Sequence, residues 1–301
     1  MKAFLKVLAA AVAGGFALPA VAALNVFACE PEWAALAQEL GGDKVSVYTA
    51  TTALQDPHRI EARPSLIARA RGADLVVCTG AELEIGWLPL VQSQSGNAKI
   101  QAGQPGYFEA ASHVALLEKP ARVDRSMGDV HPGGNPHIHL DPRNIGKIAT
   151  ALSARMAKLD PAEAATYGAR TKLFLDRWSA AIVRWEKTAA PLKGVPLVVY
   201  HKNLTYLIHW LGMREAGNLE PKPGLPPTTA HLSELLAGLK QNPAKAVVRT
   251  AYNDPRAAEW LAERAGIPSV LVPFTVGGTE GAKDLFGLYE DTLARLLAAV
   301  K

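Results

Sequence analysis

DPAEAATYGARTKLFLDRWSAAIVRWEKTAAP, residues 160–191, is the longest helical pattern in the chain. Asp160 is a suitable N-cap and Pro161 suits the first helical position. A stripe rich in aromatic residues recurs at steps of three and four until Pro191 ends it, through Tyr167, Thr171, Phe174, Trp178, Ile182 and Trp185. Such a helix would be on the order of 45 Å long. It is long enough to brace two halves of a molecule, although the same pattern also fits an ordinary core helix.

On both sides of this helix, short β-branched runs alternate with helical patterns, which indicates parallel sheets. In the first half we predict strands at 25–29, 44–49, 74–78 and 113–117, with helices at 31–40 and 64–71. In the second half we predict strands at 196–200, 245–249 and 269–272, with helices at 204–211, 230–240, 256–265 and 283–300. The expected fold is α/β, with two similar lobes at 23–159 and 192–301 joined by one long rigid helix.

The N-terminal residues 1–22 have the features of a signal peptide. Lys2 and Lys6 precede an apolar run at 7–18, and Ala20-Val21-Ala22 offers small residues for cleavage. The apolar run is too short to span a bilayer. We therefore expect an exported, periplasmic protein whose mature chain begins at Ala23.

The composition favours a soluble binding protein. Apolar residues make up 49% of the 301 residues, enough for full cores, and loss of Lys2 and Lys6 leaves +2 of the formal charge of +4. No cluster of basic residues indicates nucleic acid. We expect a monomer.

The two cysteines each end a predicted strand. Cys29 closes the first strand and Cys78 the third, so neighbouring parallel strands would bring them together. Export permits a disulfide between them. The alternative is a pair of buried thiols.

Three histidines stand at the edges of turn-forming stretches in distant parts of the chain. His58 follows Asp56-Pro57, His137 lies in a run that holds three histidines in nine residues, and His201 directly follows a predicted strand. Ligands at the carboxyl ends of strands meet at the edge where open α/β folds bind ligands. No short Cys/His cluster could hold a metal on its own. We therefore predict one metal site in the cleft between the lobes.

Several motifs together resemble the zinc-specific solute-binding proteins of bacterial ABC transporters, over essentially the whole mature chain. They are Asp56-Pro57-His58 with Pro64-Ser65, residues 73–77 through Gly80, Leu83-Glu84 with Gly86-Trp87-Leu88, Asn135-Pro136-His137 with Leu140-Asp141-Pro142, and Tyr200-His201. The resemblance implies two lobes joined by a rigid helix. It also implies that His58, His137 and His201 are metal ligands.

The third ligand indicates the metal, and the fourth is where the resemblance fails. A histidine at 201 gives a nitrogen-rich site that suits Zn²⁺, whereas manganese prefers oxygen ligands. Zinc-binding relatives supply an Asp after the last strand, but Leu271-Val272-Pro273-Phe274 has no carboxylate. We expect Asp284 as the fourth ligand, with Glu280 or water as alternatives. His139 could substitute for His137, because residues two apart in an extended segment face the same side. His131 is expected to be a solvated turn residue, or one that recruits metal transiently.

The resemblance implies a periplasmic protein that captures Zn²⁺ between its lobes and delivers it to an inner-membrane ABC permease, with or without a periplasmic zinc chaperone as donor. It implies no enzyme activity. One alternative is a secreted zinc hydrolase with three histidines and an open coordination position, although neither His-Glu-x-x-His nor Gly-x-Ser-x-Gly occurs. A second alternative is a metal-dependent adhesin or zinc buffer that uses the same residues.

Overall fold

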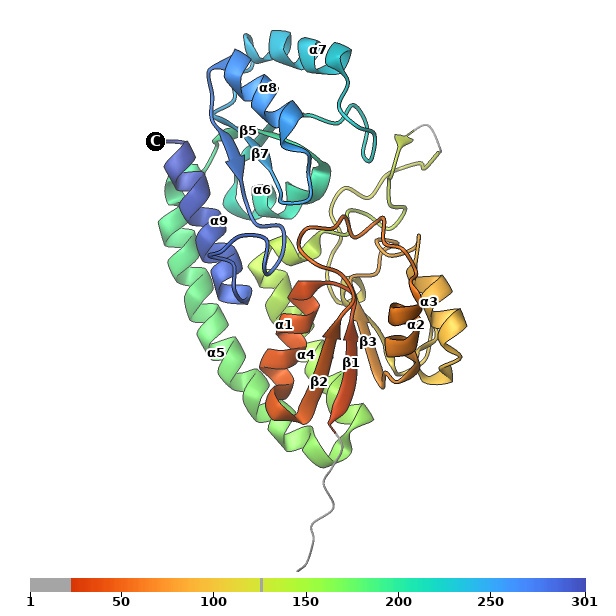
Figure 1. Cartoon of the computed structure of the whole chain (residues 1–301). Coiled ribbons are helices and arrows are strands. Elements are labelled where there is room, and N and C mark those ends of the chain that lie inside the picture. The colour runs from red at the N-terminus through yellow and green to blue at the C-terminus, as the bar shows by residue number, and fades with distance from the viewer. Residues whose placement is uncertain (1–22, 125–126) are drawn as a thin grey trace, which may run out of the picture.

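The N-terminal lobe is a parallel four-stranded sheet with helices on both faces. The computed structural model describes residues 23–124 and 127–301, so the predicted signal peptide lies outside the described residues. The strands lie in the order β2-β1-β3-β4 (Figure 1). They are β1 Leu24–Ala28, β2 Val45–Thr49, β3 Leu75–Cys78 and β4 Tyr107–Glu109, and the helices are α1 Pro31–Gly41, α2 Pro64–Arg71, α3 Leu88–Ser95 and α4 Pro142–Leu159.

Successive residues of the central strands face opposite layers, as the period of two requires. Val26 of β1 packs in the cluster that contains α1 and α4, whereas its neighbour Phe27 packs in the cluster that contains α2 and α3. Both faces are covered, which is why these strands are nearly continuous apolar runs.

The C-terminal lobe repeats this arrangement with the strand order β6-β5-β7-β8. Its strands are β5 Pro196–Val199, β6 Arg214–Asn218, β7 Ala246–Arg249 and β8 Ser269–Leu271, and its helices are α6 Thr205–Leu211, α7 Thr229–Leu239, α8 Pro255–Ala265 and α9 Leu285–Ala299. Short 3₁₀ turns occur at Gly42–Lys44, Ala98–Ile100, Ala110–His113, Ile138–Leu140 and Lys202–Leu204. The expected fold of two similar α/β lobes with parallel sheets is confirmed. The predicted limits of the lobes stay predictions.

Within the described ranges, no helix is both long and apolar enough to cross a membrane. The strand predicted at 113–117 is wrong, since the fourth strand is β4 and residues 114–117 are irregular. The backbone groups of Leu117 form hydrogen bonds without a neighbouring strand, since its N–H donates to the Tyr206 hydroxyl and its carbonyl accepts from the Asn135 N–H. The pattern also missed α3, α4, β4 and β6.

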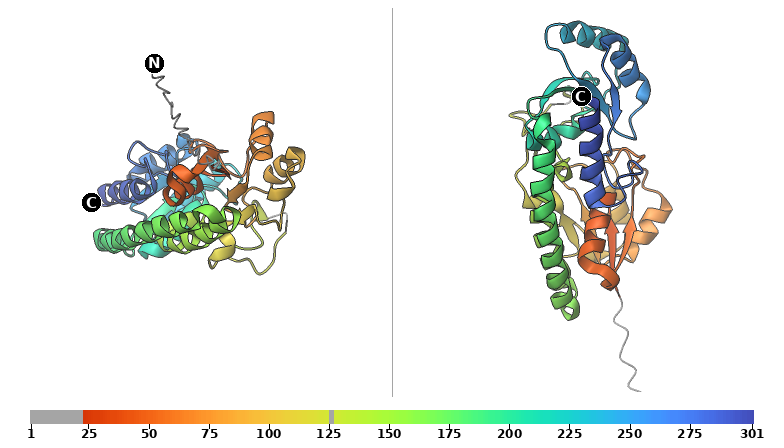
Figure 2. Two further views of the ribbon diagram at one scale, coloured as in Figure 1. Left: turned by 90° about the horizontal axis from the view of Figure 1, so that it is seen from below. Right: turned by 90° about the vertical axis from the view of Figure 1, so that its left-hand side faces the viewer.

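The long helix runs beside both lobes (Figures 1 and 2). It consists of a 3₁₀ turn at Pro161–Glu163, helix α5 at Ala164–Ala189 and a 3₁₀ turn at Ala190–Leu192. The α-helical part alone is roughly 39 Å long. The predicted stripe faces inward, with Ile182 half-buried and Tyr167, Thr171, Phe174, Trp178 and Trp185 buried. The side chain of Asp160 does not cap the helix but accepts a hydrogen bond from the Tyr167 hydroxyl at 2.8 Å.

Helix α5 contacts the two lobes through different parts of its length. Towards the N-terminal lobe, Arg177 pairs with Glu39 of α1 at 2.7 Å, and the Trp178 indole donates to the Pro142 carbonyl at 2.8 Å. Towards the C-terminal lobe, Trp185 stacks on Tyr289 of α9 with ring centroids 4.9 Å apart. The Glu186 carboxylate accepts from Trp210 of α6 at 3.0 Å. The helix therefore fixes one lobe relative to the other.

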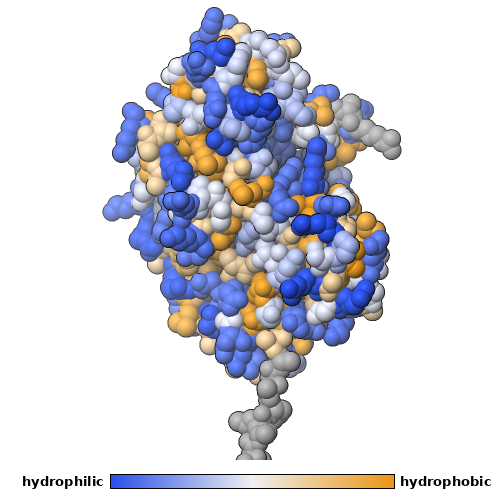
Figure 3. Space-filling model, viewed as in Figure 1, coloured by the Kyte–Doolittle hydropathy of each residue, from blue (hydrophilic) through white to orange (hydrophobic). Residues whose placement is uncertain are grey.

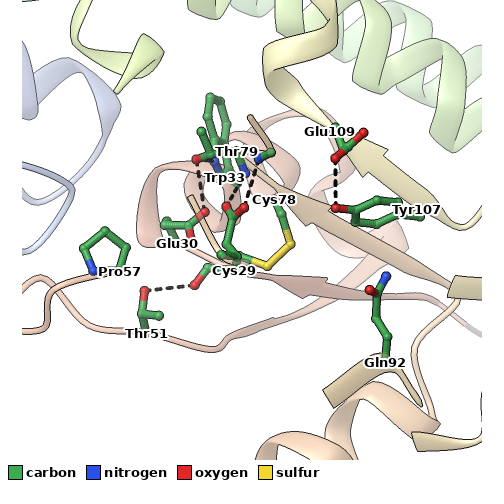
Figure 4. The surroundings of a disulfide bond; sticks show 12 residues. Cys29, Glu30, Trp33, Thr51, Pro57, Cys78, Thr79, Gln92, Tyr107 and Glu109 are labelled. Carbon is green, nitrogen blue, oxygen red and sulfur yellow. Dashed lines mark hydrogen bonds between the residues drawn. A yellow bond between two sulfur atoms is a disulfide. The ribbon is translucent and has the colours of Figure 1, made fainter. Parts of the chain in front are cut away.

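Cys29 and Cys78 form a disulfide at the ends of β1 and β3, so the alternative of two buried thiols is wrong (Figure 4). Buried carboxyl groups lie beside it. Glu84 accepts the backbone N–H groups of Thr79 and Gly80 at 2.7 and 3.1 Å, and Glu30 accepts from the Thr79 hydroxyl at 3.3 Å. Burial, the charge of Glu84 and that of Glu32 raise the pKa of Glu30 well above its usual range, and burial raises the pKa of Glu84 to about 7.

We predict that Trp178→Ala lowers the free energy of unfolding by about 3–5 kcal/mol, because it removes a buried indole at the centre of the brace. Val183→Ala is the control, since Val183 is on the same helix but 67% exposed; it should stay within about 0.5 kcal/mol of wild type. Urea unfolding of the zinc-free protein measures both. Equal effects of the two substitutions would contradict the bracing role.

We predict that the zinc-free protein loses stability as the pH rises from about 4.5 to about 7 through the titration of Glu84. The folded chain keeps a proton in this window that the unfolded chain releases, because the pKa of Glu84 is raised in the fold. Glu84→Gln removes the group that holds this proton, so the unfolding free energy of the variant should fall less than that of wild type as the pH rises. Glu259→Gln, at an exposed site on α8, should keep the wild-type slope. If the unfolding free energies of Glu84→Gln and wild type change equally with pH, Glu84 is not the group responsible.

Candidate metal centre

The three predicted ligands meet between the lobes. His58 lies in the turn after β2, His137 precedes the 3₁₀ turn that leads to α4, and His201 lies two residues after the end of β5. Their ring centroids are 5.5 Å (His58 to His137), 5.7 Å (His58 to His201) and 5.5 Å (His137 to His201) apart. One ring nitrogen from each lies within 4.8 Å of the other two. Residues 143 positions apart in the sequence thus form a nearly equilateral triangle of imidazoles.

Each ring is held through Nδ1 by a side-chain oxygen. Nδ1 of His58 lies 2.7 Å from Asp56 Oδ1, and Nδ1 of His137 lies 2.9 Å from Asn135 Oδ1. Nδ1 of His201 lies 2.7 Å from Glu220 Oε2. These acceptors place the ring proton on Nδ1 and leave Nε2 with a free lone pair. Nε2 of His137 is buried and has no hydrogen-bond partner within the described chain.

Two of the oxygen acceptors come from a repeated local motif, Asx-Pro-His, at 56–58 and 135–137. The proline restricts the residue before it to extended backbone. The same oxygens also accept the backbone N–H of His58 at 3.1 Å and of His137 at 3.0 Å. One oxygen in each motif therefore fixes both the backbone and the ring orientation of its histidine. The first copy is anchored by the Trp87 indole, which donates to the Pro57 carbonyl at 2.9 Å.

The third acceptor comes from the loop that follows β6. Glu220 accepts from His201 and from the Gly224 backbone N–H at 2.9 Å. The sequence motifs assign no role to Glu220. The repeated Asx-Pro-His spacing is a sequence signal for the other two acceptors, but Glu220 is recognisable only once the sheet is folded.

The charges around the triangle suit a divalent cation. Burial and the neighbouring His58 and His201 lower the pKa of His137 well below its usual range, so this ring stays neutral. Burial opposes ionisation of Asp56, but hydrogen bonds from His58 outweigh it and lower the pKa of Asp56. The two carboxylates Asp56 and Glu220 would balance the charge of one divalent ion, which limits the cost of burying it.

The structure does not bring Asp284 to the triangle, which corrects the expected fourth ligand. Asp284 is exposed and accepts the backbone N–H of Gly287 at 2.8 Å, as the N-cap of α9. Free amide groups at a helix N-terminus stabilise a carboxylate there. The alternative Glu280 is also exposed and does not belong to the group of ring nitrogens.

His139 also lies outside the group of converging ring nitrogens. It is fully buried, with Nδ1 3.1 Å from Glu32 of α1 and Nε2 2.8 Å from the Phe274 carbonyl, which follows β8. Residues 138–140 form a 3₁₀ turn and not an extended segment, so His137 and His139 do not share a face. His139 instead connects the two lobes.

His131 is not a solvated turn residue, which corrects the expectation for it. Its Nε2 lies 3.2 Å from Nε2 of His58, and the ring is half-buried. Burial, with smaller effects of His58 and His201, lowers its pKa to about 4. His131, His137 and His201 line one side of a cavity of about 320 Å³ between the lobes. The face of the molecule drawn in Figure 3 mixes hydrophilic and hydrophobic residues.

A triangle of oriented imidazoles between two braced α/β lobes defines a metal-binding solute-binding protein. The chain belongs to the family described as "Zinc-uptake complex component A periplasmic", which it matches over residues 26–299. It is thus a zinc-binding, exported component of a metal ABC transporter, which acts with a membrane permease.

The chain is 25% identical to the high-affinity zinc uptake system protein ZnuA of Paracoccus denitrificans, over 95% of this chain and 94% of that one. It is 26% identical to the metal ABC transporter substrate-binding lipoprotein ScbA of Streptococcus cristatus, over 52% of this chain and 48% of that one. A crystal structure of ZnuA superposes with a TM-score of 0.76 at 21% identity, covering 93% of this chain and all of that one. A metal-binding protein of Candidatus Liberibacter asiaticus, solved with manganese, superposes with a TM-score of 0.73 at 15% identity, over 92% of this chain and 99% of that one.

We predict that Glu220→Ala lowers zinc affinity by about 10–100-fold, because His201 loses the oxygen that orients its ring. Competition with a chromophoric chelator measures the affinity. Glu259→Ala removes an exposed carboxylate from the same lobe and should keep wild-type affinity. If both variants bind zinc like wild type, Glu220 does not orient the ligand.

Proposed function

We propose that His58, His137 and His201 bind the zinc ion through Nε2 and that the chain carries this ion to its permease. The observation that supports this most directly is the triangle itself, in which every Nδ1 has an oxygen acceptor. The free nitrogens lie close enough together for one ion. Zn²⁺ binds histidine at about 2.0–2.1 Å, so only a small inward adjustment of the rings is required.

The ligand set favours zinc over manganese. Imidazole nitrogen suits zinc, whereas manganese prefers carboxylate and carbonyl oxygen. In this site the carboxylates of Asp56 and Glu220 accept hydrogen bonds from Nδ1 atoms. Their oxygens therefore orient the rings and do not serve as metal ligands in this proposal. A protein solved with manganese shares the fold, and a relative in Streptococcus gordonii is named as a manganese ABC transporter substrate-binding lipoprotein. The fold therefore does not determine which metal is bound, and the choice of metal depends on the side chains that bind it.

The protein acts as a binding component without catalysis in this proposal. A zinc hydrolase needs an open coordination position and a positioned base. The two carboxylates that contact the ligand rings, Asp56 and Glu220, already accept hydrogen bonds from them. Neither is placed to take a proton from a metal-bound water.

We further propose that the mature chain begins at Ala23 and works as a periplasmic monomer. Both faces of each sheet are already covered by helices of the same chain, so a second copy is not needed to complete either core. Zinc would reach it free or from a periplasmic zinc chaperone. Analytical ultracentrifugation and mass spectrometry of the exported protein would check the mass and the N-terminus.

We predict that His58→Ala, His137→Ala and His201→Ala each lower zinc affinity by more than about 100-fold, beyond the loss expected for a residue that only orients a ligand. His209→Ala is the matched control, because His209 is exposed on α6. Chelator competition gives the affinities, and circular dichroism checks that each variant is folded. Growth on limiting zinc with the permease present tests delivery. Wild-type affinity in all three variants would overturn the proposed site, and normal growth with them would favour a zinc buffer.

A further inference from the structure

We propose that His131 is the fourth ligand of the bound zinc ion, so that four imidazoles enclose it. This inference rests on the proposed function, because it completes the same site. It replaces the expected carboxylate with a nitrogen donor from the loop that precedes Asn135.

The distance between the rings of His131 and His58 suits a shared ion. Nε2 of His131 lies 3.2 Å from Nε2 of His58, and the two ring centroids are 5.3 Å apart. Two nitrogens bound tetrahedrally to one zinc at 2.0–2.1 Å would be about 3.3 Å apart. The Nδ1 proton of His58 faces Asp56, so Nε2 of His58 presents a lone pair towards His131. A cation between the two rings satisfies both lone pairs.

An oxygen acceptor also faces the His131 ring, in this case from the backbone. The backbone of Ala81 forms a hydrogen bond with His131 that favours its protonated form, which identifies the carbonyl oxygen as the acceptor. Since Nε2 faces His58, we assign this bond to Nδ1. His131 then presents Nε2 to His58 with an oxygen behind its ring, as the other three rings have. It lies outside the group of ring nitrogens within 4.8 Å of one another, which holds His58, His137 and His201, so the His131 ring must move inward to share their ion.

The Ala81 carbonyl is positioned by a strained turn. Gly80, Ala81 and Glu82 all have positive φ, at 76°, 50° and 66°. Residues other than glycine rarely adopt this conformation, and such strain persists where surrounding contacts enforce it. The Glu84 carboxylate supplies these contacts by accepting the N–H groups of Thr79 and Gly80. The role of the strained turn is thus to direct the Ala81 carbonyl towards His131.

The loop that carries His131 is fastened to the C-terminal lobe. The backbone N–H of Asp129 donates to the Pro223 carbonyl at 2.9 Å, and Arg59 donates to the Gly224 carbonyl at 2.9 Å. Arg59 also lies 3.5 Å from the Asp129 carboxylate. A Cβ at Gly224 would lie 2.0 Å from that carboxylate, so the approach requires glycine. The loop of His131 therefore sits against the loop of Glu220, which orients His201.

The experiment compares His131→Ala with His58→Ala and with the His209→Ala control. Zinc affinity is measured by chelator competition, and X-ray absorption at the zinc edge counts the bound imidazoles. We expect four imidazoles in wild type and in His209→Ala. We expect three in His131→Ala, with an affinity lower by about 10–100-fold. His131→Asp should still bind zinc but bind Mn²⁺ more tightly than wild type does, because it supplies an oxygen donor.

The outcomes separate this inference from the proposed site. If His131→Ala keeps wild-type affinity and three imidazoles are counted in both proteins while His58→Ala loses zinc, His131 is not a ligand and the proposed triangle stands. If His58→Ala also keeps wild-type affinity, the proposed triangle itself is refuted.

Discussion

The binding site depends on the hydrogen bonds that join each histidine Nδ1 to an oxygen. An imidazole can bind a metal through either nitrogen, and only the fixed proton decides which one is available. Asp56, Asn135 and Glu220 make that decision for the three central rings. The consequence is a set of Nε2 lone pairs that converge before any ion arrives. Such preorganisation requires that the rings, and the lobes that carry them, keep their relative positions.

The lobes are held together by contacts along α5 and beside the ligands. Helix α5 connects them along one edge, and a single apolar cluster includes residues from both. Near the ligands, Nε2 of His139 lies 2.8 Å from the Phe274 carbonyl of the other lobe. The Tyr206 hydroxyl donates to the Asn135 carbonyl at 2.7 Å, and so ties α6 to the Asx-Pro-His motif. These contacts oppose a hinge-like opening of the cleft.

The sequence predicts the parts of this molecule that local patterns determine. The strands that form the centre of each sheet are β-branched runs, and the stripe of α5 has helical spacing, so both are predicted within one to four residues. The strands β4 and β6 are missed because one has three residues and the other, REAGN, is half-exposed and polar; pairing with a neighbour defines them. Asp141-Pro142 indicates a turn as well as a helix start, so α4 is ambiguous. The three central ligands are predicted from their motifs. His131 and Glu220 are not, since their roles arise from contacts between loops that only the folded lobes bring together.

The brace formed by α5 also determines how the cargo leaves. In a binding protein that closes around its ligand, the free-energy cost of closure lowers the observed affinity. Spontaneous reopening of such a protein then helps to release the ligand. Here the resting shape is already competent, so affinity is reduced by little or no conformational penalty. Thermal breathing of the lobes then contributes little to unloading. The permease must itself displace a ligand-bearing loop or supply competing donors, and we expect the docking step to set the rate of zinc transfer.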